Sequence, residues 1–530
     1  MMKPVVISGK NPMNVDSFVN VARHRAKVKC ADDARSNIFR SNQRVLQLAH
    51  GDEPVYGMNT GFGKNSSIRI SKEDMETLQE NIIRSHACGV GEAYETEVVR
   101  GAMLLRLVCF SQGYSGVRPE LFDTLLSMLN KNLVPIVPSR GSLGSSGDLA
   151  PLAHMCLPII GLGKVQYKGK ILNGLDGMRA VQIPTLKLSY KEGLALTNGC
   201  VFGESLAAIS LYEAKRIAVT AEIVSAMLAE SLEGIALGYR AEVHEARPHK
   251  GQAQTAKNLL RLLDGSTLIK WDSKTNVHSC YSIKCIPQIL GPLRTALPHV
   301  EEIVLTEMNS ATDNPLIFER NGTVYSLSGG NFHGQNIGNA TAYLAIALGS
   351  VFKNIHTLVS RATDNALSDG LPKFLTENSG LNSGLMLAQY TSGSIYNEYT
   401  GLATPLTIQN ISSCANFEDA TAMSNAQAKN LYKAVQLAYE SLAIGLITGV
   451  QALNFRINSP SPDRTDAVVL GKGTSKAYDH VKEQLSKSGM EFPYNDGKKP
   501  LGEWINMAIE IVKSGKLIDI CKDYLDNHEA

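Results

Sequence analysis

The 530-residue sequence predicts a mostly helical protein built around a long central bundle of helices, with few short strands. Across 204–233, apolar residues recur mostly at intervals of three and four, over a length that no ordinary strand reaches. Similar spacing returns across 344–358 and 431–453. Alanine and other small residues lie among these positions, which favours close approach of helices in a bundle.

Strand signals are weak, and the clearest loop lies late in the chain. Short runs of β-branched residues interrupted by glycine or lysine occur at 4–8 and 164–172, and each predicts a short strand segment. The stretch 458–474 carries NSPSPDRTD and then GKG, whose prolines, serines and glycines stop any periodic pattern. Short helical segments are expected from there to the C-terminus.

The bulk composition excludes several classes of partner. Lysine plus arginine total 52 and aspartate plus glutamate 50, with no long run of one sign, so neither nucleic acid nor an anionic membrane is expected as a partner. Nine cysteines without a C-x-x-C pair indicate a reduced, cytoplasmic protein with no structural zinc site. The start lacks an apolar signal region, and the best membrane candidate, 434–453, is broken by polar residues and glycines.

The stretch GSLGSSGDLAPLAH at 141–154 sets serines among glycines spaced in threes. A P-loop would need a lysine where Asp148 stands, and a nucleophile elbow would need glycines four apart. A flexible linker is a weaker interpretation, because the apolar run that follows is typical of buried structure. In a tight bend, the amide nitrogen of Gly147 could reach the carbonyl carbon of Ser145. Ring closure and loss of water, including the hydroxyl of Ser146, would leave an electrophilic methylidene-imidazolone.

This stretch resembles the histidine and aromatic amino-acid ammonia-lyase family, whose members form such a group from Ala-Ser-Gly within G-S-[VL]-G-A-S-G-D-L-x-P-L-[AS]-H. The resemblance implies that 4-methylidene-imidazol-5-one forms autocatalytically from Ser145, Ser146 and Gly147. It implies no metal and no dissociable cofactor. Serine replaces the usual alanine at 145, where the residue supplies only a ring substituent, so cyclisation is still expected.

The stretch VYGMNTGFGK at 55–64 would by itself indicate turn chemistry. It is similar to the Y-G-[VI]-N-T-G-F-G loop of the family, in which the tyrosine is the base that removes a β-proton. The resemblance therefore implies this role for Tyr56. A phenol with its ordinary pKa of about 10 is a weak base, so nearby positive charge is expected to activate it.

The stretch RSHACGVGE at 84–92 carries a histidine that, taken alone, would more often be structural. In the family this segment lines the substrate ring, and Ser85 with His86 resembles the histidine-specific form. Members that act on phenylalanine have an apolar residue at the selectivity position, because a phenyl ring needs no polar partners. His86 thus favours a polar ring, and a tyrosine ring would also be tolerated.

Three further segments resemble family motifs. LALTNGC places Asn198 where the family contacts the substrate and the prosthetic group, and SGGNFHGQ places Phe332 beside the electrophile. CANFEDATAM carries Glu418, where histidine lyases have glutamate and phenylalanine lyases have glutamine. Phe417 and Ala420 depart from the glutamine and histidine that are usual there, so this part of the pocket is not standard.

The stretch HSCYSIKCIPQ resembles the family segment that binds the substrate carboxylate. It supplies Tyr281 as a catalytic residue, Lys284 where arginine is usual, and His278 where glutamine is common. Arginine binds a carboxylate through two parallel hydrogen bonds and lysine as a point charge. The ion pair with the substrate is therefore expected to persist with a looser orientation.

The resemblance implies elimination of ammonia from a small amino acid, giving urocanate when the substrate is histidine. It also implies a homotetramer with active sites shared between subunits, so that Tyr56, Ser146 and Tyr281 need not share a chain. Within the chain we expect an N-terminal region at 1–200 carrying the tyrosine loop and the prosthetic-group segment, a central bundle at 201–457, and a helical C-terminal region at 458–530. A lyase or 2,3-aminomutase acting on tyrosine or phenylalanine, and a non-catalytic relative, remain alternatives.

Overall fold

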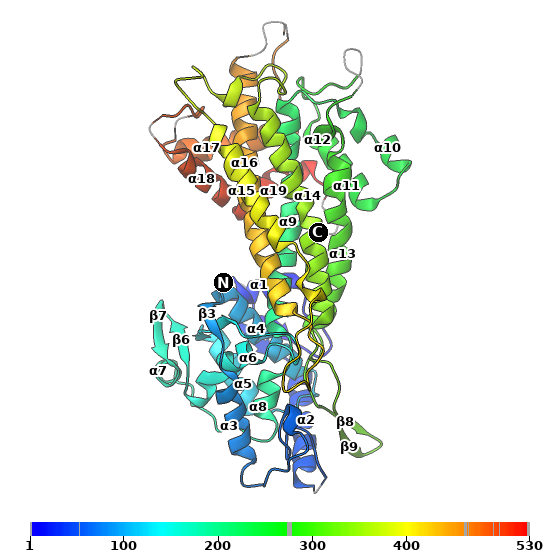
Figure 1. Ribbon diagram of the computed structural model, residues 1–530, viewed down its shortest axis with the longest axis vertical. Helices are drawn as coiled ribbons and strands as arrows, with labels where there is room; N and C mark the ends of the chain where they lie inside the picture. The colour runs from blue at the N-terminus through cyan, green and yellow to red at the C-terminus, as the bar shows by residue number, and fades with distance from the viewer. Residues whose placement is uncertain are drawn as a thin grey trace. The chain divides into compact units, whose positions relative to one another are not determined.

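A computed structural model describes residues 3–51, 53–272, 278–459, 464, 466–490, 492–497 and 499–526 (Figure 1). Helices dominate and the strands are short, which confirms the predicted fold class. The chain forms two compact units. The first comprises Met1–Tyr212, Val300–Ala342 and Pro405–Tyr432, and the second comprises Glu213–His299, Tyr343–Thr404 and Lys433–Ala530. Each unit thus combines three separate stretches of the chain. The division into three consecutive regions at 1–200, 201–457 and 458–530 remains a prediction.

Four long helices contribute residues to both units. They are α9 (Val201–Ser231), α13 (Ile286–Met308), α14 (Gln335–Thr363) and α16 (Ser424–Asn458). The periodic stretches at 204–233, 344–358 and 431–453 fall on α9, α14 and α16. Apolar residues at helical spacing favour a helix that packs against its neighbours, and α9 is buried almost throughout. These three predictions are confirmed.

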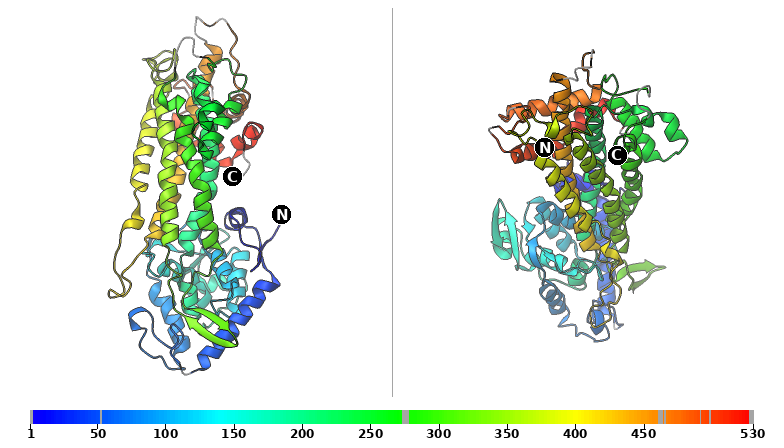
Figure 2. Two further views of the ribbon diagram at one scale, coloured as in Figure 1. Left: turned by 90° about the vertical axis from the view of Figure 1, so that its right-hand side faces the viewer. Right: turned by 45° about the horizontal axis from the view of Figure 1, so that its top comes forward.

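Within the second unit, a glycine permits close packing of the bundle. A side chain at Gly445 of α16 would place its Cβ 2.8 Å from Ile355 of α14 and 2.9 Å from Val224 of α9. These helices run side by side there (Figures 1 and 2). The shorter helices of this unit are α10 (Ala241–Glu245), α11 (Lys250–Leu262), α12 (Tyr281–Lys284), α15 (Met386–Leu402), α17 (Lys472–Lys487), α18 (Leu501–Ser514) and α19 (Lys516–Cys521).

The first unit holds the remaining α-helices and all the described strands. The helices are α1 (Val15–Ala22), α2 (Asp32–His50), α3 (Met75–His86), α4 (Thr96–Ser111), α5 (Pro119–Asn130), α6 (Leu149–Cys156), α7 (Gly174–Ala180) and α8 (Glu192–Thr197). Two small sheets are β1 (Val5–Ile7) with β2 (Val28–Cys30), parallel, and β8 (Leu316–Arg320) with β9 (Thr323–Leu327), antiparallel. The others join β3 (Val90–Ala93) to β5 (Pro138–Arg140), and β4 (Val134–Pro135) to β6 (Lys164–Tyr167) and β7 (Lys170–Asn173).

Both stretches expected to form strands do so, and the second is a hairpin. Strand β1 lies within 4–8, whereas 164–172 divides into β6 and β7. Lys168 and Gly169 between them have φ values of 48° and 78°. Positive φ at both central residues is the requirement of a tight two-residue hairpin turn, and the glycine makes it accessible. Of the loop predicted at 458–474, the described residues between α16 and α17 form neither helix nor strand, whereas 472–474 already belong to α17, and 460–463 and 465 lie outside the described residues.

Helix α14 is the one described helix that is long and apolar enough to cross a membrane by those criteria alone. Of its most apolar 18-residue window, 56% is buried inside the protein. Burial of this kind is typical of a helix in a protein core. The stretch 434–453 lies within α16 and does not meet the same criteria.

Candidate active site

The segment at 141–154 connects β5 to α6 in the first unit. Its apolar end forms the helix: Ala150 is 3% exposed, and Leu152 and Ala153 are fully buried. The interpretation of the segment as a flexible linker is therefore wrong. The serine-rich part before it is a loop whose conformation is set by neighbouring backbone.

Gly147 lies where no other residue fits. Its φ is 79°, and an added Cβ would lie 2.1 Å from the carbonyl oxygen of Gly199. On either side of this approach, the Asp148 amide donates to the Gly199 carbonyl at 2.7 Å, and the Gly199 amide donates to the Ser146 carbonyl at 3.3 Å. The bend at Ser145, Ser146 and Gly147 is thus held against the residues just before α9. It requires glycine at 147, and a glycine amide nitrogen can approach a carbonyl carbon because no Cβ blocks it.

Asp148 fastens this loop to the start of α9. Its buried carboxylate accepts hydrogen bonds from the Ser142 hydroxyl at 2.8 Å, the Phe202 and Gly203 amides at 3.0 and 2.9 Å, and the Asn425 amide group at 2.9 Å. Burial raises the pKa of Asp148, and these donors oppose that rise. An acceptor at a helix N-terminus satisfies amides that have no partner within the helix. Asp148 is therefore structural support for the loop.

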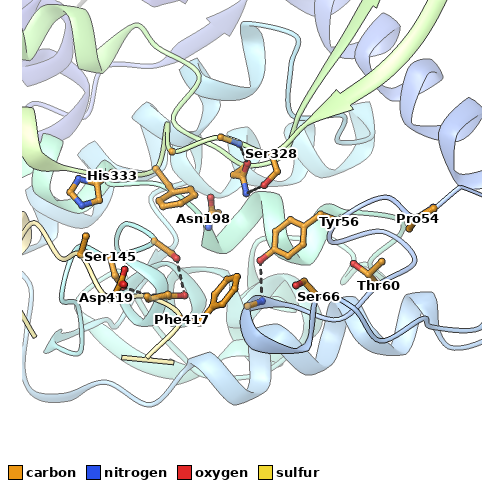
Figure 3. Close-up of a pocket in the computed structure, with 18 residues that line it drawn as sticks. Pro54, Tyr56, Thr60, Ser66, Ser145, Asn198, Ser328, His333, Phe417 and Asp419 are labelled. Atoms are coloured by element: carbon orange, nitrogen blue, oxygen red, sulfur yellow. Dashed lines mark hydrogen bonds between the residues drawn. The ribbon is translucent and has the colours of Figure 1, made fainter. Parts of the chain in front are cut away.

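A cavity of about 700 Å³ lies over the loop (Figure 3). Its walls include the predicted site residues Tyr56, Ser145, Ser146, Asn198, Phe332 and Glu418. A second cavity of about 460 Å³ shares several of these residues and adds His86 and the apolar side chains of Phe62, Ile82 and Leu194. The first unit alone thus brings together eight of the eleven predicted residues, counting the adjoining Gly147.

Glu418 connects the loop to the opposite wall of the first cavity. Its Oε2 accepts a hydrogen bond from the Ser145 hydroxyl at 2.6 Å, and its Oε1 accepts one from the Ser146 hydroxyl at 3.0 Å. A tight turn presents the carboxylate: Ser413 pairs with Glu418 through two backbone hydrogen bonds, and Cys414–Asn416 between them have φ from 51° to 60°. Left-handed conformation at consecutive non-glycine residues is costly and typical of functional loops.

Tyr56 lies on the other side of the same space. Its Oη accepts a hydrogen bond from the Gly63 amide at 3.1 Å. Burial raises the pKa of Tyr56, the negative charge of Glu418 raises it further, and the Gly63 hydrogen bond opposes the rise. None of the groups that shift this pKa is a cation. The positive charge expected beside the phenol is therefore not supplied by the described part of this chain.

His86 closes the second cavity at the end of α3. The Ser85 hydroxyl lies 3.0 Å from its Nδ1. Burial lowers the pKa of His86 and the nearby charge of Glu418 opposes that change, so the ring is neutral near neutral pH. A neutral imidazole can donate one hydrogen bond and accept another. His86 thus gives this cavity a polar wall among apolar side chains.

Asn198 follows α8 and lines both cavities. It is 5% exposed, and its Oδ1 has no hydrogen-bond partner. A buried acceptor without a donor is rare in native proteins. At the wall that the two cavities share, this oxygen can accept a hydrogen bond from a ligand or from water.

Three predicted residues belong to the second unit and line neither cavity. Tyr281 and Lys284 form α12, and His278 precedes it. Tyr281 is 71% exposed, and the Lys284 ammonium lies 4.9 Å from its ring centre. His278 is exposed. Their assignment to the active site remains a prediction.

Sequence reasoning missed other residues of the first cavity. Asn314 and Ser328 lie in its wall and bond to each other at 3.2 Å; Ser328 begins the quoted stretch SGGNFHGQ, whereas no sequence pattern marks Asn314. His333 and Asp419 also line it. These two directly follow Phe332 and Glu418 within quoted motifs, so adjacency in those motifs was the available signal.

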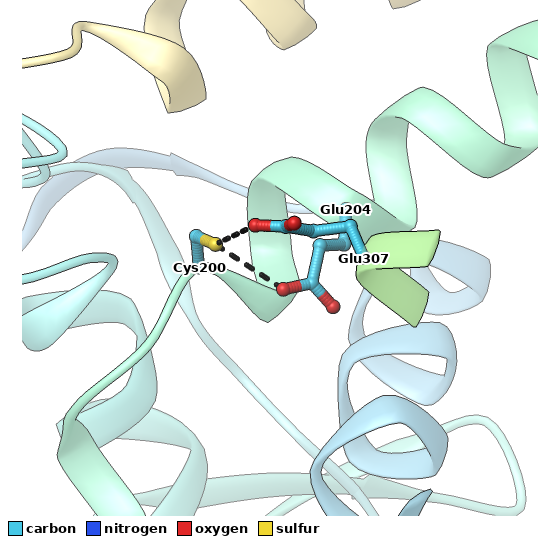
Figure 4. A group of neighbouring side chains, drawn as sticks. All are labelled: Cys200, Glu204 and Glu307. Carbon is cyan, nitrogen blue, oxygen red and sulfur yellow. Dashed lines mark hydrogen bonds between the residues drawn. The ribbon is translucent and has the colours of Figure 1, made fainter. Parts of the chain in front are cut away.

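Within the described residues, one group of side chains is close enough to hold a metal ion: Cys200, Glu204 and Glu307, with ligand atoms within 4.8 Å (Figure 4). The Cys200 thiol donates toward both carboxyl groups, at 3.2 and 3.4 Å. Burial raises the pKa of Glu204 and of Glu307, and that of the thiol. The Arg106 guanidinium is close enough to oppose the rise at Glu204, and this charge would repel a cation. We interpret the group as a protonated hydrogen-bonded cluster.

Glu204→Gln is expected to make stability less sensitive to alkaline pH. The raised pKa means that folded Glu204 keeps its proton while the unfolded chain releases it. Below the pKa of Glu204 in the unfolded chain, this group does not lower the free energy of unfolding. As pH rises from there toward the pKa in the folded state, the free energy of unfolding decreases. The decrease in melting temperature from about pH 5 to about pH 9 should be smaller in the variant than in the wild type. An equal fall in both proteins would contradict a raised pKa at Glu204.

Comparisons with known proteins agree with these observations. The family model described as "Aromatic amino acid lyase" matches residues 13–483. The chain is 41% identical to a histidine ammonia-lyase of Caldanaerobacter subterraneus over 522 residues, which are 98% of this chain and 99% of that protein. It is 40% identical to histidine ammonia-lyase 2 of Fusobacterium nucleatum, over 98% of each chain.

Solved structures show the same fold. Histidine ammonia-lyase from Trypanosoma cruzi matches with a TM-score of 0.88 at 29% identity, over 99% of this chain and 96% of that one. Tyrosine aminomutase from Streptomyces globisporus matches with a TM-score of 0.89 at 30% identity, over 99% of each chain. With a family match along most of its length and relatives near 40% identity, this chain belongs to the aromatic amino acid lyase family.

Proposed function

We propose that this protein is a histidine ammonia-lyase, which eliminates ammonia from L-histidine to give urocanate. Family membership makes it a carbon–nitrogen lyase, and the relatives near 40% identity that we name are histidine ammonia-lyases. The choice of histidine as substrate rests on the second cavity, which is lined by His86, Glu418 and Ser146. Polar side chains with both donor and acceptor capacity suit an imidazole ring and leave a phenyl ring without partners.

The proposed prosthetic group is 4-methylidene-imidazol-5-one made from Ser145, Ser146 and Gly147. Support comes from the side-chain-free bend at Gly147 and from the unpartnered Oδ1 of Asn198 beside it. When present, such a group supplies an electrophile that turns the substrate amine into a leaving group. The residues of the chain then bind the substrate, exclude water and move the proton.

Tyr56 is proposed to remove the β-proton, because its hydroxyl lies at the cavity that Ser146 and Asn198 also line. Within one chain its surroundings favour the neutral phenol. A cation from elsewhere would favour the phenolate that acts as base. Lys284 of a second copy is our candidate for a nearby positive charge, with His278 and Tyr281 of that copy completing the site around the substrate carboxylate.

A homotetramer with shared active sites is therefore part of the proposal. Exposed apolar side chains on the second unit support it. Tyr343 and Ile346 on α14 are 44% and 55% exposed, and Leu387 and Tyr390 on α15 are 50% and 67% exposed. Each pair lies one turn apart on one helix face, and such apolar surface is typical of a subunit interface. We infer a cytoplasmic setting from the nine free cysteines, and a small amino acid as the substrate from the histidine ammonia-lyase relatives.

The similarity to tyrosine aminomutase keeps one rival in view, namely deamination or isomerisation of tyrosine. Purified protein should be given histidine, tyrosine and phenylalanine, with the unsaturated acid and the β-amino acid measured for each. We expect urocanate from histidine and hardly any product from phenylalanine. Turnover of tyrosine or phenylalanine without turnover of histidine would overturn the proposed substrate and leave the family assignment intact.

Glu418→Gln sharpens this test. A hydrogen bond to the carboxylate is available only to a ring that carries nitrogen atoms, whereas its charge effect on Tyr56 is common to all substrates, so the variant should lose histidine turnover by a larger factor than any residual phenylalanine turnover. Removal of a buried hydrogen-bonding partner of this kind changes selectivity by about 10-fold or more. The ratio of kcat/KM for the two substrates is the measurement, and an unchanged ratio would remove Glu418 from ring recognition.

A further inference from the structure

Ser145, the residue that replaces the usual alanine, donates its hydroxyl to Glu418. The Oγ to Oε2 distance is 2.6 Å, in the short range typical of a hydroxyl bonded to a carboxylate. The side chain has little access to water, since Ser145 is 8% exposed. An alanine at this position would leave that carboxylate oxygen without this donor.

The second donor to Glu418 is lost when the prosthetic group forms. Ser146 donates to Oε1 at 3.0 Å, and its hydroxyl leaves as water in the proposed maturation. Within the described part of this chain, these two hydroxyls are the donors that Glu418 has. Of these two donors, Ser145 is the one that maturation would leave to bond to the carboxylate.

Glu418 is half-buried and follows an exposed turn. The turn that carries it, Cys414–Phe417, is exposed at every position, and Phe417 is 55% exposed. By contrast, the loop that carries Ser145 is held in place, because Gly147 lies against Gly199 and Asp148 is bonded to α9. A hydrogen bond from a fixed donor restricts the rotation of a carboxylate on an exposed turn.

We propose that Ser145 is a positioning residue for Glu418. It holds Oε2 in place and so leaves Oε1 directed to the cavity, where the ring nitrogen of the substrate binds. This inference rests on the proposed histidine ammonia-lyase function. It assigns to residue 145 a role separate from supplying a substituent of the prosthetic group.

A double-mutant cycle tests the link. Ser145→Ala should retain the mass deficit of two waters, which reports the prosthetic group, and should lower kcat/KM for histidine by about 10-fold, the effect of one hydrogen bond to a charged group. Ser145→Thr keeps a hydroxyl and should recover most of the loss. In a Glu418→Gln background, the same Ser145→Ala change should alter kcat/KM by less than about twofold.

A second readout needs no turnover. Ser146→Ala lacks the hydroxyl that maturation removes, so it presents Glu418 with Ser145 as its remaining donor. Calorimetric binding of L-histidine to this inactive protein should weaken by about 10-fold when Ser145→Ala is added. Adding Ser145→Ala to a protein that carries both Ser146→Ala and Glu418→Gln should leave the affinity unchanged.

Two results would overturn the inference. One is a change in kcat/KM on Ser145→Ala that is equal with and without the Glu418 carboxylate. No change in kcat/KM in either background would count as such a result. The other is loss of the mass deficit in Ser145→Ala, which would place the role of the residue in forming the group. If the wild type instead deaminates tyrosine or phenylalanine, the proposed function fails, and the same cycle with the accepted substrate still decides whether Ser145 acts through Glu418.

Discussion

Ser146→Ala is expected to abolish turnover while the protein remains folded and assembled. The change removes the hydroxyl, and without it the dehydration that creates the methylidene carbon cannot occur. Among the residues that the structure describes, this hydroxyl bonds only to Glu418, whereas the loop itself is held by Asp148 and by the approach of Gly147 to Gly199. Loss of one hydrogen bond at a solvent-accessible cavity costs about 1 kcal/mol, which is small compared with the total free energy of unfolding.

The measurements are turnover, near-ultraviolet absorbance and intact mass. The variant should lack the absorbance of the conjugated ring and the mass deficit of two waters, and its melting temperature should stay close to that of the wild type. Ser145→Ala is the matched control, since it makes the same change one residue earlier and should retain both signatures. Wild-type turnover in Ser146→Ala would show that the prosthetic-group hypothesis is wrong.

The helical architecture could be predicted because its signal is local. Apolar spacing within 204–233 requires a helix with a buried face, and α9 begins and ends within three residues of that stretch. The hairpin at 164–172 was harder to predict from the sequence. Its reversal depends on positive φ at Lys168, a residue that gives little sign of a turn, so only Gly169 marked it.

The active site could be predicted as far as contiguous motifs extended. Tyr56, Ser146, Asn198 and Glu418 come from four separate motifs, and the structure places all four around one cavity. Asn314 lines the same cavity through tertiary folding alone, because its bonds to Ser328 and to the Gly329 amide are formed by a loop returning from β9. No local pattern encodes such a contact.

The charge environment of the base was the least accessible to sequence reasoning. A motif identifies Tyr56, but its pKa depends on burial and on Glu418, which is more than 300 positions away in the sequence. Both influences raise the pKa, opposite to what a base requires. The proposed role of Tyr56 as base therefore requires a cation in addition to the groups that shift its pKa within one chain.

Tyr56→Phe is expected to lower kcat by about 10²- to 10⁴-fold, the usual effect of removing a general base. The change deletes one oxygen and little volume. The Gly63 amide loses its acceptor, so a small loss of stability is also expected. The prosthetic group should be retained, since the phenol lies apart from the Ser145–Gly147 bend. Intact mass with kcat separates loss of the base from loss of the electrophile.

The pH dependence gives the same prediction a sign. The base acts as phenolate, and burial and the Glu418 charge raise the pKa of Tyr56, so kcat/KM should increase toward alkaline pH in the wild type. Glu418→Gln removes the negative charge, so the pKa of Tyr56 should fall and the normalised rise should move to lower pH. Tyr56→Phe should lack the rise altogether. A Tyr56→Phe enzyme that keeps wild-type turnover and an unchanged alkaline limb would assign the proton transfer to another residue.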